Sequence, residues 1–218
     1  MKKQILLIGV LLCGVLAAIY FVKNQSKDQL FVVMDVPEFE FANQDNQIIT
    51  PKELLGKVYV VEFFFTNCPT ICPVMNQNLI KVESEINSPD FGIISITIDP
   101  KRDTPEVLKE HKQHLGIHNP NWHFLSADRE SIYSVSKKFN IFMGKDESSA
   151  EGLEHSGKMA LVDKNGKIRS RYNASGIPIL YYSGLNYEDS KGNTSSLTGK
   201  YHPEMDMLKE DIKVLLNQ

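Results

Sequence analysis

The sequence predicts an α/β protein with a mainly parallel central sheet that is flanked by helices. Lys57 to Phe65 (KVYVVEFFF) is rich in β-branched and aromatic residues, the composition of a strand buried on both faces of a sheet. Phe91 to Ile98 (FGIISITI) is a second such run, and a helix signal follows it. Because strands and helices continue to alternate along the chain, the connections are expected to be parallel crossovers within one sheet.

Two further elements in the first half of the chain have their own signals. Phe39 to Thr50 has Asn46-Gln47 in its middle, which predicts a hairpin at the entrance of the domain. After the second buried strand, Thr104 can cap a helix that has Pro105 in its first turn and runs to about His114.

The second half repeats the strand and helix pattern and then changes to a hairpin. Trp122 to Ser126 predicts a third strand, and a helix from about Arg129 to Phe139 follows it. Met159 to Val162 and Lys167 to Tyr172 flank Lys164-Asn165-Gly166, which predicts two antiparallel strands joined by a tight turn. Strand and helix units that end in a hairpin describe a thioredoxin-like sheet.

The C-terminal part is predicted to be a long loop followed by one helix. Ser183 to Lys200 is rich in Gly, Ser, Asn and Thr and has no periodicity, so it is expected to be a loop without chemistry. The helix runs from about Pro203 to Leu216, and its apolar residues recur at the spacing that covers a sheet. These residues are Met205, Leu208, Ile212 and Leu215.

An apolar segment behind two lysines begins the chain. Ile5 to Val22 carries no charge and would rise about 27 Å as a helix, close to the thickness of a bilayer core. We therefore expect an N-terminal transmembrane anchor at 1–22, a tether at 23–35 and one thioredoxin-like domain at 36–218. Lys2 and Lys3 precede the span, which places the domain outside the cytoplasm, facing the periplasm from a bacterial inner membrane.

A cleaved signal peptide is the alternative to an anchor at this position. The end of the apolar run, Tyr20-Phe21-Val22-Lys23, lacks a cleavage site of small residues. Cys13 raises the question of a lipoprotein signal, but that signal has a small residue before the cysteine, and Leu12 stands there. The anchor is therefore the favoured interpretation.

The charge and the cysteines limit the class of protein further. After Val22, 22 Lys and Arg against 27 Asp and Glu give a formal charge of −5, so nucleic acid is not an expected partner. The 218 residues of the chain fit one core. Cys68 and Cys72 are the two cysteines outside the apolar segment, and their close spacing indicates chemistry rather than a stabilising framework.

Cys68 and Cys72 lie where a buried strand is followed by a helix. If the helix begins near Cys68, both residues lie on one face with their Cβ atoms about 5–6 Å apart, and both sulfurs can reach one ion. The positive end of the helix dipole favours a thiolate and should lower the pKa of Cys68. Thiolates are soft ligands that favour Cu(I). A disulfide between the two is also open, so they are equally a candidate redox pair.

Two blocks of sequence resemble a known family. FFFTNCPTICPVM resembles the signature of the Sco/SenC family of copper-binding proteins that help to assemble cytochrome c oxidase, and TIDPKRDTPEVLKEH resembles its second block. The resemblance runs from about Val36 to Ser175 and resumes in the last helix, whereas the loop from Ser183 to Lys200 is longer than the family usually carries. The family's third copper ligand is a histidine just before a hairpin strand, and His155 fits that place.

The resemblance implies a function as well as a fold. It implies a membrane-tethered copper chaperone that binds Cu(I) or Cu(II) through Cys68, Cys72 and His155. The implied recipient is the dinuclear copper centre of cytochrome c oxidase, so the expected partners are the copper-centre subunit of the oxidase and a thioredoxin-like reductant. A thiol-disulfide oxidoreductase that keeps the oxidase cysteines reduced is the alternative, and a peroxide-reducing enzyme is a weaker one. Neither enzyme needs His155, which therefore discriminates among the three.

Other polar residues carry weaker signals. Asp99 and Asp103 lie at the carboxyl end of a parallel strand, where α/β proteins place their sites. The resemblance implies that one of them tunes the site or docks a partner, and a role in a turn or helix start is equally open. The spacing of three further histidines suits either a second metal site or a solvated helix face, and two more are isolated. They are His111, His114 and His118, and then His123 and His202.

Overall fold

The structure is a computed structural model that describes residues 14, 30–141, 143–144, 154–173, 175–185 and 203–218. The chain divides into two compact units, Met1–Phe31 and Val32–Gln218. The predicted anchor at 1–22 lies outside the described residues apart from Gly14. Within the described part, no helix is both long and apolar enough to cross a bilayer.

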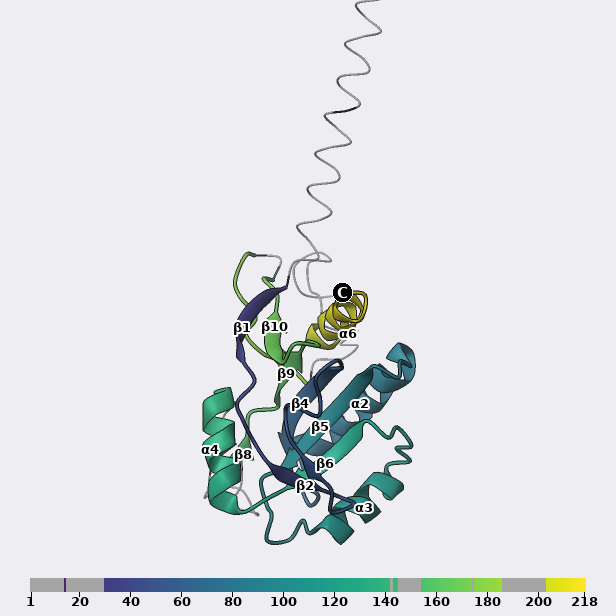
Figure 1. The fold of residues 1–218 in the computed structure, drawn as a ribbon, viewed down its shortest axis with the longest axis vertical. Coiled ribbons are helices and arrows are strands. Elements are labelled where there is room, and N and C mark those ends of the chain that lie inside the picture. The colour runs from purple at the N-terminus through teal and green to yellow at the C-terminus, as the bar shows by residue number, and fades with distance from the viewer. Residues whose placement is uncertain (1–13, 15–29, 142, 145–153, 174, 186–202) are drawn as a thin grey trace, which may run out of the picture. The chain divides into compact units, whose positions relative to one another are not determined.

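The second unit is built on a nine-stranded sheet with the strand order β1-β10-β9-β4-β5-β6-β2-β3, and β11 pairs with β9. Figure 1 shows the central strands β4, β5 and β6 side by side. The strands of this sheet are β1 (Phe31–Asp35), β2 (Phe41–Asn43), β3 (Ile48–Ile49), β4 (Val58–Phe64), β5 (Phe91–Thr97), β6 (Trp122–Ser126), β9 (Lys158–Val162), β10 (Lys167–Ser170) and β11 (Tyr182–Ser183). A separate two-stranded sheet contains β7 (Met143–Gly144) and β8 (Glu154–His155).

The sheet is mixed, so the prediction of a mainly parallel sheet is wrong. β4 pairs with β5 and β5 with β6 in parallel, as the crossovers required. β9 joins β4 antiparallel, and β2 joins β6 antiparallel. The reason is that the two hairpins, β9 with β10 and β2 with β3, add their strands to the two sides of the parallel centre rather than standing apart from it.

Four helices are described: α2 (Ile71–Ile86), α3 (Pro105–His114), α4 (Arg129–Phe139) and α6 (Glu204–Leu216). Consecutive residues of a strand point to opposite faces of its sheet. Phe64 of β4 stacks on His111 of α3, whereas Phe63 meets Phe139 of α4 edge to face. Helices α3 and α4 therefore cover opposite faces.

The central elements form where the sequence predicts them. Every residue of β4 and of β5 is buried, as expected for strands covered on both faces. The bounds of α3 and α4 match the predicted ones, and both helices are capped by a side chain. The Thr104 hydroxyl accepts from the Val107 amide at 3.5 Å, and the Asp128 carboxylate accepts from the Ser131 amide at 2.9 Å.

The predicted hairpin at the domain entrance is present as β2 and β3. The Asn43 side-chain oxygen accepts from the amides of Asp45 and Gln47, both at 2.9 Å, and thereby closes the turn. Asn46 supplies the left-handed conformation that the turn needs, with φ of 58°.

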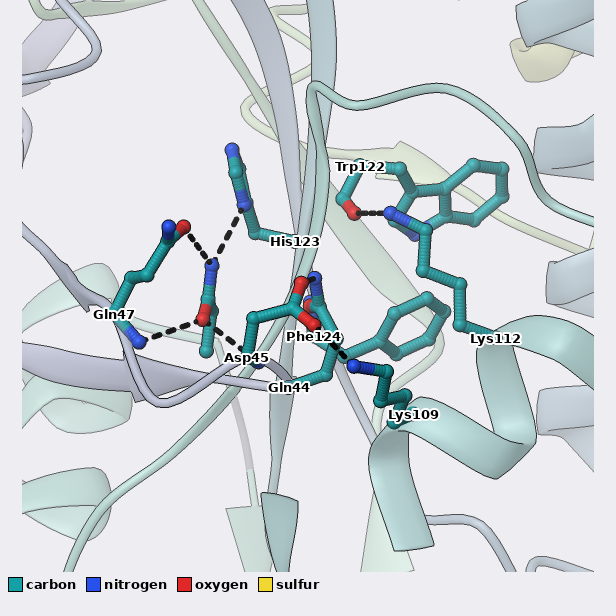
Figure 2. Close-up of polar contacts among 9 residues, drawn as sticks. Gln44, Asp45, Gln47, Lys109, Lys112, Trp122, His123 and Phe124 are labelled. Atoms are coloured by element: carbon teal, nitrogen blue, oxygen red, sulfur yellow. Dashed lines mark hydrogen bonds and ion pairs between the residues drawn. The ribbon is translucent and has the colours of Figure 1, made fainter. Parts of the chain in front are cut away.

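Side chains of this hairpin attach it to the neighbouring strand and helix (Figure 2). The Gln44 side-chain oxygen accepts from the Phe124 amide at 2.9 Å, and Asp45 pairs with Lys109 of α3 at 2.9 Å. The His123 ring nitrogen Nδ1 lies 3.3 Å from the Asn43 amide nitrogen. His123, isolated in the sequence, is therefore a structural residue of this edge of the sheet.

The C-terminal helix and the second hairpin match the prediction, whereas residues 186–200 of the predicted loop lie outside the described part. The residues predicted to line the inner face of α6 are buried, and β9 and β10 form the expected hairpin. Ser183, however, lies in β11, which pairs with β9. Tyr182 is completely buried and anchors this short strand. The described part of the tether differs likewise, because residues 31–35 form the edge strand β1.

Gly92 at the start of β5 should not tolerate alanine. An added Cβ would lie 2.7 Å from the backbone oxygen of Asn121, which accepts from the Ile93 amide at 3.0 Å. The oxygen cannot retreat without breaking that bond, so we expect Gly92→Ala to cost about 1–3 kcal/mol of unfolding free energy. Urea denaturation measures the loss, and an unchanged midpoint would contradict the clash.

Candidate metal centre

Cys68 and Cys72 lie on either side of the start of α2. The helix begins at Ile71, so Cys72 is in its first turn and Cys68 is in the loop that precedes it. The condition considered from the sequence, a helix that begins near Cys68, is therefore not met. Pro73 explains the later start, because proline has no amide hydrogen and is tolerated only in the first turn of a helix. A helix beginning at Cys68 would have placed Pro73 in its interior.

The loop nevertheless brings the two cysteines together. The Cys72 amide donates to the Cys68 sulfur at 3.5 Å, and the Thr70 hydroxyl oxygen lies 3.7 Å from the same sulfur. Both residues are present as thiols and are buried, with 7% and 2% of their surface exposed. The first turn of α2 thus directs a backbone donor at Cys68, which stabilises negative charge on its sulfur.

The surroundings of Cys72 change its proton affinity. The pKa of Cys72 is raised far above the ordinary range of a thiol, first by its hydrogen bond with Cys68 and then by burial. Cys72 therefore holds its proton more tightly than an ordinary thiol. The expectation for Cys68 itself stays a prediction.

The segment that contains His155 approaches the start of α2. His155 pairs with Met143 in the small sheet of β7 and β8, and its side chain lies outside the described part. Two residues later, a Cβ added at Gly157 would lie 3.5 Å from the Ile71 side chain. Ile71 immediately precedes Cys72. The backbone of the His155 segment therefore lies next to the helix start that contains Cys72.

The described histidines outside the proposed site form no second metal site, and His202 lies outside the described residues. No group of three or more His, Cys, Asp or Glu able to hold a metal ion occurs among the side chains that the structure describes. Helix α3 ends at His114, so His118 lies beyond the helix face on which the spacing would have placed it. His111 instead stacks on Phe64 at 5.7 Å. Its burial lowers its pKa, which Asp103 partly opposes.

Asp99 and Asp103 have separate environments. Asp99 pairs with Arg102 at 2.5 Å. Asp103 is buried, and its carboxylate accepts hydrogen bonds from Thr66, in the cysteine loop, and from Thr97. The sequence left the roles of both open, and the structure connects Asp103 to the loop that contains Cys68.

Sequence reasoning missed Glu62, a buried carboxyl group in β4. Its oxygen Oε1 accepts from the Ser95 hydroxyl at 2.7 Å, while Oε2 has no hydrogen-bond partner among the described residues. Burial raises the pKa of Glu62 to about 7, although the Ser95 bond opposes the shift. The signal was present, because a single acid in an otherwise apolar buried strand requires an explanation.

These features define a class of protein: a thioredoxin-like α/β domain with a dithiol site between the end of a central strand and the first turn of a helix. The SCO1/SenC family pattern matches residues 29–184, and the chain belongs to this family. A SCO2-like protein of Rickettsia felis is 34% identical over 147 residues, which cover 65% of this chain and 70% of that protein.

Solved structures agree with this assignment. A SCO1/SenC family lipoprotein from Bacillus anthracis matches with a TM-score of 0.64 at 30% identity, over 84% of this chain and 95% of that one. BsSco, a member of the Sco family of cytochrome c oxidase assembly proteins with an identified disulfide switch, matches with a TM-score of 0.65 at 25% identity, over 86% and 98%. Copper-bound ScoI of Bradyrhizobium japonicum has the same fold, with a TM-score of 0.60 at 20% identity over 84% and 99%.

Proposed function

We propose that this chain is a copper chaperone that binds copper through Cys68, Cys72 and His155 and delivers it to the dinuclear copper centre of cytochrome c oxidase. The observation that carries the proposal is the pair of thiols at the start of α2, with the His155 segment beside it. Membership of the SCO1/SenC family supports it, since BsSco belongs to a family of oxidase assembly proteins.

The proposed ligands suit copper and suit its transfer. Two thiolates and a neutral imidazole form a three-coordinate site for Cu(I). An added oxygen donor or water would allow the same site to bind Cu(II). The ligands come from the loop before α2, from its first turn and from β8. A three-ligand site built from separate segments leaves a position open for an incoming ligand of the recipient, as a closed four-ligand cage does not.

The proposal includes the place of the protein in the cell. Residues 1–22 would anchor it to the inner membrane, residues beyond them would tether it, and the copper domain would face the periplasm. The B. anthracis relative, a lipoprotein, fits a family that works at a membrane surface. The recipient would be the copper-centre subunit of the oxidase, and a thioredoxin-like reductant would return a Cys68–Cys72 disulfide to the thiol form.

Copper titration of His155→Ala tests the proposal. The reduced full chain should bind one copper, whereas His155→Ala should bind it at least about tenfold more weakly, because even groups that only orient ligands affect metal affinity by 10–100-fold. Absorption from thiolate to Cu(II) gives the second readout. His118→Ala, which changes an exposed histidine beyond α3, is the matched control and should bind like the unaltered chain. Unaltered affinity and stoichiometry in His155→Ala would remove the histidine from the site.

A thiol-disulfide oxidoreductase is the second candidate function. It is favoured by the contact between the two cysteines, since exchange requires an attacking thiolate and a resolving partner. The turnover of a model disulfide by the metal-free protein measures this activity. A rate no faster than that of a free thiol leaves copper delivery as the function, and fast exchange combined with weak copper binding reverses the order.

A further inference from the structure

The loop that contains Cys68 is hydrogen-bonded to a buried carboxylate from another segment of the chain, that of Asp103. Asp103 lies between β5 and α3 and is 1% exposed. Its Oδ2 accepts from the Thr66 amide at 3.1 Å, and its Oδ1 accepts from the Thr66 hydroxyl at 2.5 Å. Oδ2 also accepts from the Thr97 hydroxyl at 2.5 Å. Hydrogen bonds to an ionised acceptor are about twice as strong as those between neutral groups.

Thr66 is the residue through which this contact reaches the site. It stands two residues before Cys68, where the chain leaves β4. Within the loop, the Cys68 amide donates to the Phe65 oxygen at 3.3 Å, and Thr70, the residue before α2, makes no side-chain capping bond to that helix. Binding both the amide and the hydroxyl of Thr66 fixes the direction in which the chain continues toward Cys68.

Asp103 is itself fixed by the end of the neighbouring strand. Its amide donates to the Asp99 oxygen at 2.9 Å, and the Asp99 amide donates to the Thr97 hydroxyl at 3.0 Å. Thr97 pairs with Phe64 in the parallel register of β4 and β5. The loops that follow two adjacent strands are therefore joined through one carboxylate.

We propose that Asp103 is a positioning residue of the copper site, which acts through Thr66 on the placement of Cys68 and does not bind the metal. Its two oxygens are already occupied by Thr66 and Thr97. The inference rests on the proposed function for its copper readout, but the placement of the cysteines can also be measured without metal.

Asp103→Asn on the full chain is the test. Asparagine removes the negative charge that strengthens all three bonds, and an amide nitrogen in the place of Oδ2 would face the Thr66 amide, which can only donate. Asp163→Asn is the matched control, since Asp163 is also buried and accepts from the amides of Asn165 and Lys167, in the β9–β10 turn. Each variant changes one buried carboxylate, but only Asp103 contacts the cysteine loop.

Two readouts separate positioning from general stability. The first is the equilibrium with glutathione disulfide, which takes two electrons and two protons from Cys68 and Cys72 and becomes two glutathione thiols. The second is the energy and strength of the thiolate-to-Cu(II) absorption. We expect Asp103→Asn to shift the disulfide equilibrium by at least about tenfold and to alter the copper spectrum, because hydrogen bonds to charged groups carry free energies of that size. Asp163→Asn should leave both as in the unaltered chain.

The outcomes distinguish this inference from the proposed function. If Asp103→Asn and Asp163→Asn behave alike in both readouts, Asp103 has no positioning role. If the unaltered chain binds no copper, the proposed function fails, and the disulfide equilibrium still decides the role of Asp103. Should Asp103→Asn not fold, Thr66→Val, which removes one of the bonds, decides by the same measurements: a smaller shift in the same direction supports the inference, and no shift overturns it.

Discussion

Replacing Asp211 with alanine should lower the free energy of unfolding by about 3–5 kcal/mol, because it removes one partner of a buried ion pair. Asp211 lies on the inner face of α6 and is completely buried. Its Oδ1 accepts from Arg171 at 3.0 Å and 2.5 Å, and its Oδ2 accepts from the Tyr182 hydroxyl at 2.5 Å. Alanine would leave a largely buried guanidinium and a buried hydroxyl without this acceptor.

Glu210→Ala is the matched control, since Glu210 contacts the same guanidinium at 2.9 Å. Its side chain is 51% exposed, and exposed pairs contribute about 0–1 kcal/mol. Urea denaturation of both variants gives the comparison. Equal losses would show that Asp211 does not behave as a buried partner.

The parts of the fold that the sequence predicts well are those governed by local signals. The buried strands β4 and β5 are continuous apolar runs, and α3 has its cap and its proline in the expected places. The start of α2 was missed although Pro73 marks it. Placing both cysteines on one helix face overlooked that Pro73 has no amide hydrogen to donate inside a helix.

The parts that could not be predicted depend on contacts between distant segments. The Asp103 carboxylate meets a threonine 37 residues earlier in the chain, and no local pattern marks that pair. The mixed sheet has the same cause, since a hairpin signal does not say which strand the hairpin will join. His155 was assigned from family resemblance, because the spacing of a lone histidine predicts no ligand.

A pH-dependent prediction concerns the groups with shifted pKa values. Burial lowers the pKa of His111 and of His123 below the ordinary 6.5. The unfolded chain therefore binds more protons than the folded one as the pH falls below about 6.5, and these histidines make the fold less stable in acid. Glu62 acts in the opposite direction in an overlapping range of pH, so the stability of the unaltered chain combines the two effects.

Glu62→Gln isolates the contribution of the buried acid. The ordinary pKa of 4.5 rises to about 7 in the fold, so between these values the folded protein holds a proton that the unfolded chain has lost. Stability from Glu62 is complete below pH 4.5 and is lost as the pH rises through 7. Relative to the unaltered chain, Glu62→Gln should therefore gain about 3 kcal/mol between pH 4.5 and pH 8. Urea denaturation at several pH values measures the gain.

The change in this difference with pH is the decisive quantity. A glutamine amide at Oε2 introduces its own constant cost, because that position has no partner among the described residues, but a constant cost does not vary with pH. Ser95→Ala is the companion variant: it removes the bond that stabilises the charged form, so its stability should fall more steeply with pH than that of the unaltered chain. A difference between Glu62→Gln and the unaltered chain that is the same at pH 5 and pH 8 would mean that Glu62 ionises in the fold as it does in the unfolded chain, and that water reaches its carboxyl group.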